Sequence, residues 1–176
     1  ACDISEQISL ASKEASGTGN MKYMMNGAIT LGTMDGANVE IVERVDFENA
    51  EIFGLRVEDV DHFKQENSYN VWQYYDTHYE IKRVVDTLTN GTFSADPQDF
   101  RIIYNELMFK NDEFFVLADF NAYREAQERV ERRYQDKQGW ARMCLVNIAK
   151  SGFFSSDRTI QQYADEIWHI NPIDVK

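Results

Sequence analysis

The sequence is poor in the residues that form disulfides and bind metals. It has two cysteines, Cys2 and Cys144, and three histidines, His62, His78 and His169, all far apart along the chain. Two such cysteines provide neither a disulfide framework nor a thiolate metal site, because both need several cysteines at suitable spacing. We therefore expect no metal centre.

Positive charge is also scarce. The 176 residues include 18 lysines and arginines against 30 aspartates and glutamates, which gives a formal net charge of -12. A surplus of negative charge repels the phosphates of nucleic acids and anionic lipid headgroups. Nucleic acid and membrane surfaces are therefore poor candidate partners.

Long apolar runs are missing as well. No stretch approaches the roughly 18 apolar residues that a membrane-spanning helix needs. The first residues, Ala-Cys-Asp-Ile-Ser-Glu, lack the basic and apolar regions of a signal peptide, so we expect a cytoplasmic protein. Material for a core is present, because 43% of the residues are hydrophobic and 13% are aromatic.

The chain divides into two segments that differ in glycine content and in the spacing of apolar residues. Residues 1–55 hold six of the nine glycines and alternate short apolar runs with turn residues, which predicts strands over 28–33 and 51–54 with helices between them. Residues 56–176 carry apolar side chains at helical spacing and should be mainly helical. Two strands alone make a poor parallel sheet, so we interpret this helix-rich α/β chain as part of something larger.

Regular apolar stripes predict the helices of the second segment. One stripe runs from Val71 to Leu88, with Gly91 as its stop signal. Further stripes predict helices over 100–107, 120–134 (with Asp119 as candidate N-cap), 140–148 and 160–168.

Charged clusters of this segment have simple structural explanations. Glu58, Asp59 and Asp61 lie at helical spacing, which favours a solvated helix face over a metal site. The run 125–133, EAQERVERR, is typical of surface ion pairs along one helix. Asp35 and Gly36 are most simply a turn before a helix that starts at Ala37, with a secondary chance of lining a site.

A glycine-rich segment, EASGTGNMKY at residues 14–23, is the candidate binding site. Gly17 and Gly19 permit a tight turn that brings successive N–H groups toward a ligand. From Asn20 onward the sequence predicts a short helix, ended by Gly27. The start of a helix favours anions, because its free N–H groups and the positive end of its dipole point at the ligand.

The side chains of this segment extend the same prediction. Ser16 and Thr18 add hydroxyl donors, and Lys22 falls on the predicted first helical turn. A ligand that carries phosphate is therefore the natural candidate. The nucleotide pattern G-x-x-x-x-G-K-[ST] fails, because Met21 precedes the lysine and Tyr23 follows it, and the pattern G-x-G-x-x-G is not completed either.

Lys22 itself has an apolar setting in the sequence, among Met21, Tyr23, Met24 and Met25. Such surroundings disfavour the charged amine, and a neutral amine can bond to an aldehyde. Pyridoxal phosphate supplies an aldehyde and a phosphate together. Because a lysine near a helix start is usually a solvated surface residue, spacing alone leaves three hypotheses open: a pyridoxal phosphate site, a simple phosphate-binding module, and a helical interaction domain with a structural loop.

The longer run from Glu14 to Ile41 resembles the pyridoxal phosphate segment of the α-glucan phosphorylase family, which includes glycogen, starch and maltodextrin phosphorylases. DISEQIS at 3–9, IFGLRVEDV at 52–60 and SGFFSSDRTIQQYADEIW at 151–168 are similar to the same family in the same order. The resemblance covers nearly the whole chain. It implies the C-terminal portion of a two-lobed glycosyltransferase of the GT-B type, within the Rossmann-like second lobe.

The resemblance also implies roles for individual residues. Lys22 matches the lysine that carries pyridoxal phosphate, and Thr18 and Gly19 match contacts of the cofactor phosphate. The positions that match contacts of the transferred glucosyl unit are Glu14, Ser16 and Gly17.

The implied reaction is reversible phosphorolysis. Orthophosphate cleaves the terminal α-1,4-linked glucose from a glucan and releases glucose 1-phosphate with retained configuration. In the family the basic residues that bind the substrate phosphate lie upstream of the matched region. We therefore expect this polypeptide to be inactive alone and to work with the upstream lobe of the same enzyme.

Overall fold

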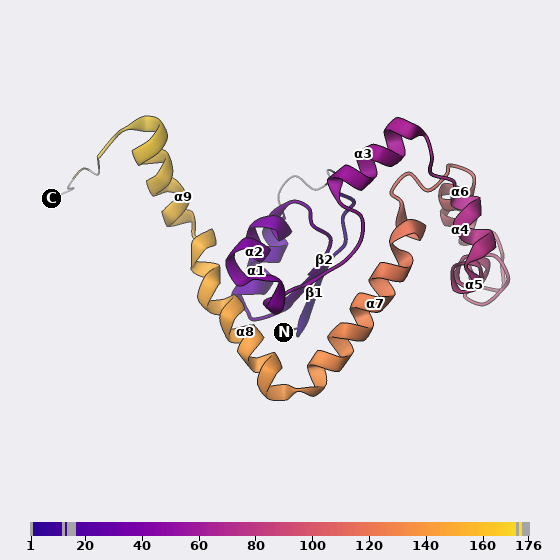
Figure 1. Ribbon diagram of the computed structural model, residues 1–176, viewed down its shortest axis with the longest axis horizontal. Coiled ribbons are helices and arrows are strands. Elements are labelled where there is room, and N and C mark those ends of the chain that lie inside the picture. Colours follow the sequence, from indigo (N-terminus) through magenta and orange to yellow (C-terminus); the bar gives the residue numbers. More distant parts are fainter. Residues whose placement is uncertain (1, 12, 14–16, 172, 174–176) are drawn as a thin grey trace.

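The computed structural model describes most of the chain, namely residues 2–11, 13, 17–171 and 173 (Figure 1). Its centre is a parallel sheet with the strand order β1 (Ile4–Gln7), β2 (Ile29–Gly32) and β3 (Glu51–Ile52). The register places Ile4 beside Ile29 and Leu31 beside Glu51. A helix-rich α/β fold with a small parallel sheet is therefore confirmed.

β1 is a strand that the sequence pattern did not predict. Its four residues, Ile-Ser-Glu-Gln, are not of alternating apolar and polar type, and Ser5 is buried. The neighbouring strand β2 is buried at every position, so its backbone groups need hydrogen-bond partners within the protein. Parallel pairing with β2, rather than its own side-chain pattern, explains why residues 4–7 form a strand.

The sheet lies between two layers of helices. α1 (Thr18–Met25) connects β1 to β2, and α2 (Ala37–Val45) leads from β2 through a short 3-10 helix to β3. Successive side chains of a strand point to opposite faces. Phe53 packs with α7 and α8 on one face, whereas Ile52 packs against Met24 of α1 and Ile41 of α2 on the other.

The remaining helices are α3 (Val57–Glu66), α4 (Val71–Thr77), α5 (Tyr79–Thr87), α6 (Arg101–Met108), α7 (Val116–Gln135), α8 (Lys137–Lys150) and α9 (Ser156–Gln162), which continues into a π-helical turn (Tyr163–Trp168). In Figure 1, α7 and α8 form the two arms of a V beside the sheet. α3 to α6 gather at the far end of α7, and α9 extends from the far end of α8. None of the described helices is long and apolar enough to cross a membrane.

The helices α3 to α6 pack around an apolar core that they share with the segment after β1 and the start of α7, and in it Val60, Val71, Ile81 and Val85 are each at most 1% exposed. The predicted single helix from Val71 to Leu88 is wrong, because the chain breaks at His78, whose backbone is extended. The break allows α4 and α5 to pack against each other, and the hydroxyl of Tyr75 on α4 donates to Asp86 on α5 at 2.6 Å.

Asp119 does not cap α7. The residue before the helix is Phe115, and Asp119 lies in the first turn. Its carboxylate instead accepts a hydrogen bond from the backbone N–H of Leu55 at 2.8 Å. Asp119 therefore fastens the segment that follows β3 to the start of α7. The expected solvated face of α3 is confirmed, because Glu58, Asp59 and Asp61 are exposed.

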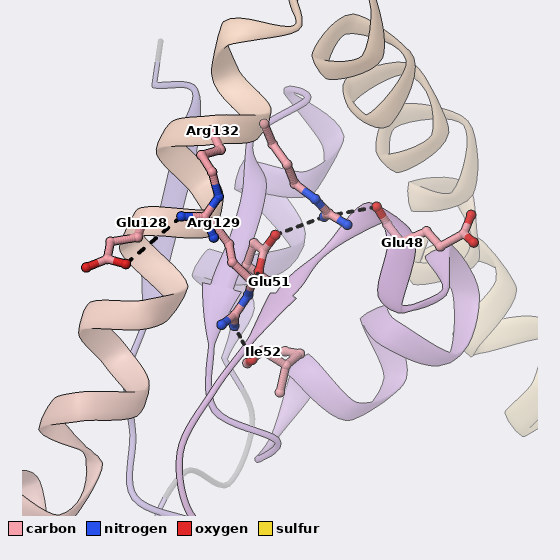
Figure 2. Close-up of polar contacts among 7 residues, drawn as sticks. Glu48, Glu51, Ile52, Glu128, Arg129 and Arg132 are labelled. Atoms are coloured by element: carbon pink, nitrogen blue, oxygen red, sulfur yellow. Dashed lines mark hydrogen bonds and ion pairs between the residues drawn. The ribbon is translucent and has the colours of Figure 1, made fainter.

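The charged run 125–133 forms contacts that differ from the prediction. Arg132 does pair with Glu128 along α7, at 4.0 Å. Arg129 and Arg133, however, reach across to β3 and bind the Glu51 carboxylate at 3.1 and 2.9 Å. Figure 2 shows Arg129 of α7 close to Glu51. The Glu51 side chain is 5% exposed, so these ion pairs join α7 to the sheet and are not pairs along the surface of one helix.

Candidate functional site

The first turns of α1 and α2 lie together at one edge of the sheet. α1 begins at Thr18 after β1, and α2 begins at Ala37 after β2. Both helices start beyond the carboxyl ends of their strands, the edge at which open parallel sheets bind ligands. The predicted turn before α2 is confirmed: Asn38 N–H donates to the Asp35 carbonyl at 3.1 Å, and Gly36 has a φ of 51°, which favours glycine.

A buried pair of amides joins these two helix starts. Asn20 Nδ2 donates to Asn38 Oδ1 at 2.5 Å, and the two residues are 3% and 1% exposed. Asn38 Nδ2 donates to the carbonyls of Thr33, at 2.9 Å, and Gln7, at 3.3 Å. Sequence reasoning missed this pair, because an asparagine at a helix start carries no sign of a partner 18 positions away.

The strand ends beneath the pair are tied together by further hydrogen bonds. The Thr33 backbone N–H donates to the Gln7 carbonyl at 3.2 Å, and the Thr33 hydroxyl donates to the Ser9 carbonyl at 2.5 Å. Ser9 Oγ donates to Asp35 Oδ2 at 3.4 Å. Hydrogen bonds thus connect the carboxyl ends of β1 and β2 into one polar network beneath α1.

α1 turns one face to the core and the other outward. Asn20 and Met24 are buried, whereas Thr18, Gly19 and Lys22 are exposed. Thr18 and Lys22 are four residues apart, so they lie on the same side of the helix. Three of the predicted site residues are therefore together on one exposed helix face.

Two expectations about Lys22 need correction. The helix starts at Thr18 rather than at Asn20, so Lys22 lies in the last turn of α1 and not the first. Its apolar sequence neighbours do not enclose it either: Met24 is buried in the core, while Tyr23 is 46% and Met25 58% exposed. The helical period of 3.6 residues sends adjacent side chains to different faces, which the linear sequence does not reveal.

The glycines of the segment act differently from the prediction. Gly17 has a φ of -89°, so it needs no left-handed conformation, and the Asn20 carboxamide lies so close that a side chain at position 17 would collide with it. Gly19 lies within α1, and no atom of the described residues lies within 4 Å of the place where its Cβ would be. Glu14 and Ser16 lie outside the described residues.

A pocket of about 570 Å³ opens at the same edge of the sheet. Its lining includes Ser9 and Thr33 from the strand ends, Phe53, and Asp119 and Tyr123 from α7. Burial is the main cause that raises the pKa of the Asp119 carboxyl above its ordinary value, and the hydrogen bond from Leu55 N–H opposes it. The described lining contains none of Thr18, Gly19 and Lys22, so the pocket lies beside the predicted site and not on it.

The exposed face of α1 carries side chains that could hold a ligand with both a phosphate and an aldehyde. The first N–H groups of a helix have no intrahelical acceptor, and no described atom lies within 4 Å of the Cβ position of Gly19. The Thr18 hydroxyl adds a donor, and Lys22 follows four residues later, a rise of about 6 Å along the helix axis. Within the described residues, no three histidine, cysteine, aspartate or glutamate side chains gather as a metal site needs.

Comparison with known proteins decides the family. The sequence model described as carbohydrate phosphorylase matches residues 1–170. The chain belongs to the carbohydrate phosphorylase family. The family resemblance of the glycine-rich segment and the later motifs is thereby confirmed.

Individual relatives in this family are glycogen phosphorylases. The muscle form of Bos taurus is 54% identical over 173 residues, which cover 98% of this chain and 20% of the relative. Glycogen phosphorylase of Bacillus subtilis (strain 168) is 50% identical over 98% of this chain and 22% of the relative. The brain form of Mus musculus is 50% identical over the full chain and 21% of the relative. The chain thus spans about a fifth of the length of these relatives.

Proposed function

We propose that this chain is the C-terminal part of an α-glucan phosphorylase, an enzyme that releases glucose 1-phosphate from α-1,4-glucan by phosphorolysis with pyridoxal phosphate. The observation that carries the proposal is the exposed face of α1, where Thr18 and Gly19 at the helix start lie on the same side as the amine of Lys22. The relatives named glycogen phosphorylase support it.

Each residue of the segment has a part in this proposal. Lys22 holds the cofactor through its amine, and the helix start at Thr18 and Gly19 binds the cofactor phosphate. When bound, pyridoxal phosphate supplies a phosphate group for proton transfer beside the substrate phosphate. Glu14, Ser16 and Gly17 bind hydroxyls of the glucosyl unit, because a carboxylate accepts and backbone N–H groups donate the hydrogen bonds that sugar hydroxyls form.

The proposal includes the larger architecture. The chain forms the later part of a Rossmann-like lobe of a GT-B enzyme, which the parallel sheet between two helical layers supports. Residues 1–55 carry the cofactor side, and residues 56–176 form the helical remainder. The upstream lobe of the same cytoplasmic enzyme supplies the cations for orthophosphate, so the chain is inactive by itself.

Chemical trapping of the cofactor tests the assignment of Lys22. The full-length protein is incubated with pyridoxal phosphate, reduced with borohydride and mapped by peptide mass. We expect the label on Lys22, and Lys22→Ala should abolish it, whereas the matched variant Lys64→Ala, an exposed lysine on α3, should not. Label distributed over surface lysines and unchanged in Lys22→Ala would refute the site and leave a phosphate module or a structural loop as the explanation.

A further inference from the structure

We propose that Asn38 is a positioning residue for the cofactor site, although it lies on α2 and outside the glycine-rich segment. Its buried amide holds Asn20 and thereby sets the orientation of α1. This inference rests on the proposed function, because it assumes that the outward face of α1 binds pyridoxal phosphate.

The orientation of the Asn38 amide is determined by the strands. Nδ2 donates to the carbonyls of Thr33 and Gln7, just beyond β2 and at the end of β1. With both N–H groups directed at the sheet edge, Oδ1 must point away from it, toward α1. There it accepts the hydrogen bond from Asn20 Nδ2 at 2.5 Å. Asn38 therefore links the position of the strand ends to the position of Asn20 on α1.

Asn20 is the part of α1 that receives this constraint. It is the third residue of the helix, directly after Gly19 and two positions before Lys22. Each residue adds about 100° of rotation and 1.5 Å of rise, so the direction of one buried side chain sets the directions of its exposed neighbours. A rotation of α1 about its axis would move the N–H groups at its start and the Lys22 amine together.

Two glycines make room for the amide pair, one on each side. A side chain at Gly32 would place its Cβ 2.6 Å from Asn38 Nδ2. A side chain at Gly17 would collide with the Asn20 carboxamide, whose Cγ would lie 3.0 Å from the Cβ. Neither glycine has a positive φ, so close approach of neighbouring atoms, and not backbone conformation, explains both; at Gly32 the Gln7 carbonyl oxygen, 2.5 Å from the Cβ, adds to the approach of the Asn38 amide.

A hydrogen-bonded amide pair fixes the orientation of the helix that carries it, which apolar packing does less strictly. Buried polar groups add little net stability over apolar groups of the same shape, but each lost partner leaves a costly unsatisfied atom. The pair therefore tolerates few arrangements, and those few fix the rotation of α1. Such precision matters for a site in which one short helix must bind a phosphate and present an amine.

The test compares two buried asparagines in the full-length enzyme. Asn38→Ala removes the proposed positioning contact. Asn147→Ala is the matched control, because Asn147 on α8 is 0% exposed and its Nδ2 also donates to two carbonyls, those of Asn49 and Met143. The readouts are the affinity of the apoenzyme for pyridoxal phosphate, the visible circular dichroism of the bound cofactor, and the thermal midpoint.

We expect Asn38→Ala to weaken cofactor affinity by about tenfold, as the loss of supporting contacts around a bound group does. It should also change the circular dichroism of the cofactor, whereas Asn147→Ala should lower the thermal midpoint and leave both cofactor readouts unchanged. If Asn38→Ala does not fold, Asn38→Ser, which keeps a small polar side chain, is measured instead. Equal cofactor readouts for the two sites would overturn the inference.

The parent enzyme separates this inference from the proposed function. If the parent binds pyridoxal phosphate at Lys22 and Asn38→Ala binds it with the same affinity and spectrum, only the positioning role is refuted. If the parent does not bind the cofactor at Lys22, both proposals are refuted.

Discussion

At the sheet edge the buried polar side chains include the neutral amides of Asn20 and Asn38, beside Thr33 and Asp35, whereas at the helical end they include the carboxylate of Asp112, which is 2% exposed. The amides lie beneath an open helix face that carries Thr18, Gly19 and Lys22. Asp112 lies beside an aromatic core, in which Tyr69 contacts Phe115 at 4.7 Å between ring centroids.

The helical end uses its buried group to hold a strained loop. Asp112 Oδ2 accepts hydrogen bonds from the Tyr69 hydroxyl at 2.7 Å and from Leu117 N–H at 2.8 Å. Asn111, Asp112 and Phe115 have φ values of 58°, 45° and 53°, in the left-handed region that costs energy for residues other than glycine. The Asp112 hydrogen bonds offset that cost and fix the entry into α7.

The comparison separates two uses of buried polarity. At the helical end the hydrogen bonds stabilise the fold and join groups that are themselves buried. At the sheet edge they orient groups that remain exposed, which is what a binding face requires. Substitutions at the helical end should therefore change stability alone, and substitutions on the face of α1 should change binding.

The largest effect on stability is expected for Asp112→Ala. The change leaves the Tyr69 hydroxyl and the Leu117 N–H buried without their acceptor and releases the strained loop. We expect a loss of about 3 kcal/mol in the free energy of unfolding, measured by urea titration, without a change in cofactor affinity. The neighbouring Glu113, whose side chain is 71% exposed, is the control, and Glu113→Ala should cost less than about 0.5 kcal/mol. Equal losses in the two variants would contradict a structural role for Asp112.

A smaller and pH-dependent effect is expected for Tyr69→Phe. Burial, and then the Asp112 carboxylate, raise the pKa of the Tyr69 hydroxyl above its ordinary value of 10.0. Above that pH the unfolded chain loses this proton while the folded chain keeps it, so the stability of the parent falls as pH rises. Tyr69→Phe should cost about 1 kcal/mol at neutral pH and show a shallower decline above pH 10.0.

Tyr79 provides the control for this pH dependence, because it is 76% exposed. Tyr79→Phe should leave the alkaline decline as it is in the parent. An unchanged decline in Tyr69→Phe would show that other groups cause it.

The smallest effect on stability, with the opposite sign, is expected for Gly19→Ala. No described atom lies within 4 Å of the new methyl group, and alanine favours a helix, so stability should rise by about 0.5 kcal/mol. Pyridoxal phosphate should bind more weakly, because the methyl group occupies the space in front of the helix start. Gly152→Ala, which also introduces a methyl group into open space, should leave cofactor affinity unchanged. Unaltered affinity in Gly19→Ala would place the phosphate elsewhere.

The predictable parts of the fold were those with local signals. The stripes at 100–107, 120–134 and 140–148 fall within or close to α6, α7 and α8, because helical periodicity depends on residues three and four apart. β1 and the break at His78 were not predicted, because pairing with β2 and packing of α4 on α5 decide them. The same holds for Glu51, whose arginine partners lie 78 and 82 positions away.

The sequence by itself determined the family, the helix-rich α/β class and the segment around Lys22, because glycine spacing, apolar periodicity and motif order are properties of the linear chain. Only the tertiary structure decided where α1 begins, which of its side chains face outward, and that Asn20 and Asn38 lie together beneath it. The physical reason is that a buried hydrogen bond forms between groups that folding brings together, and residues 18 positions apart carry no local signal of that contact.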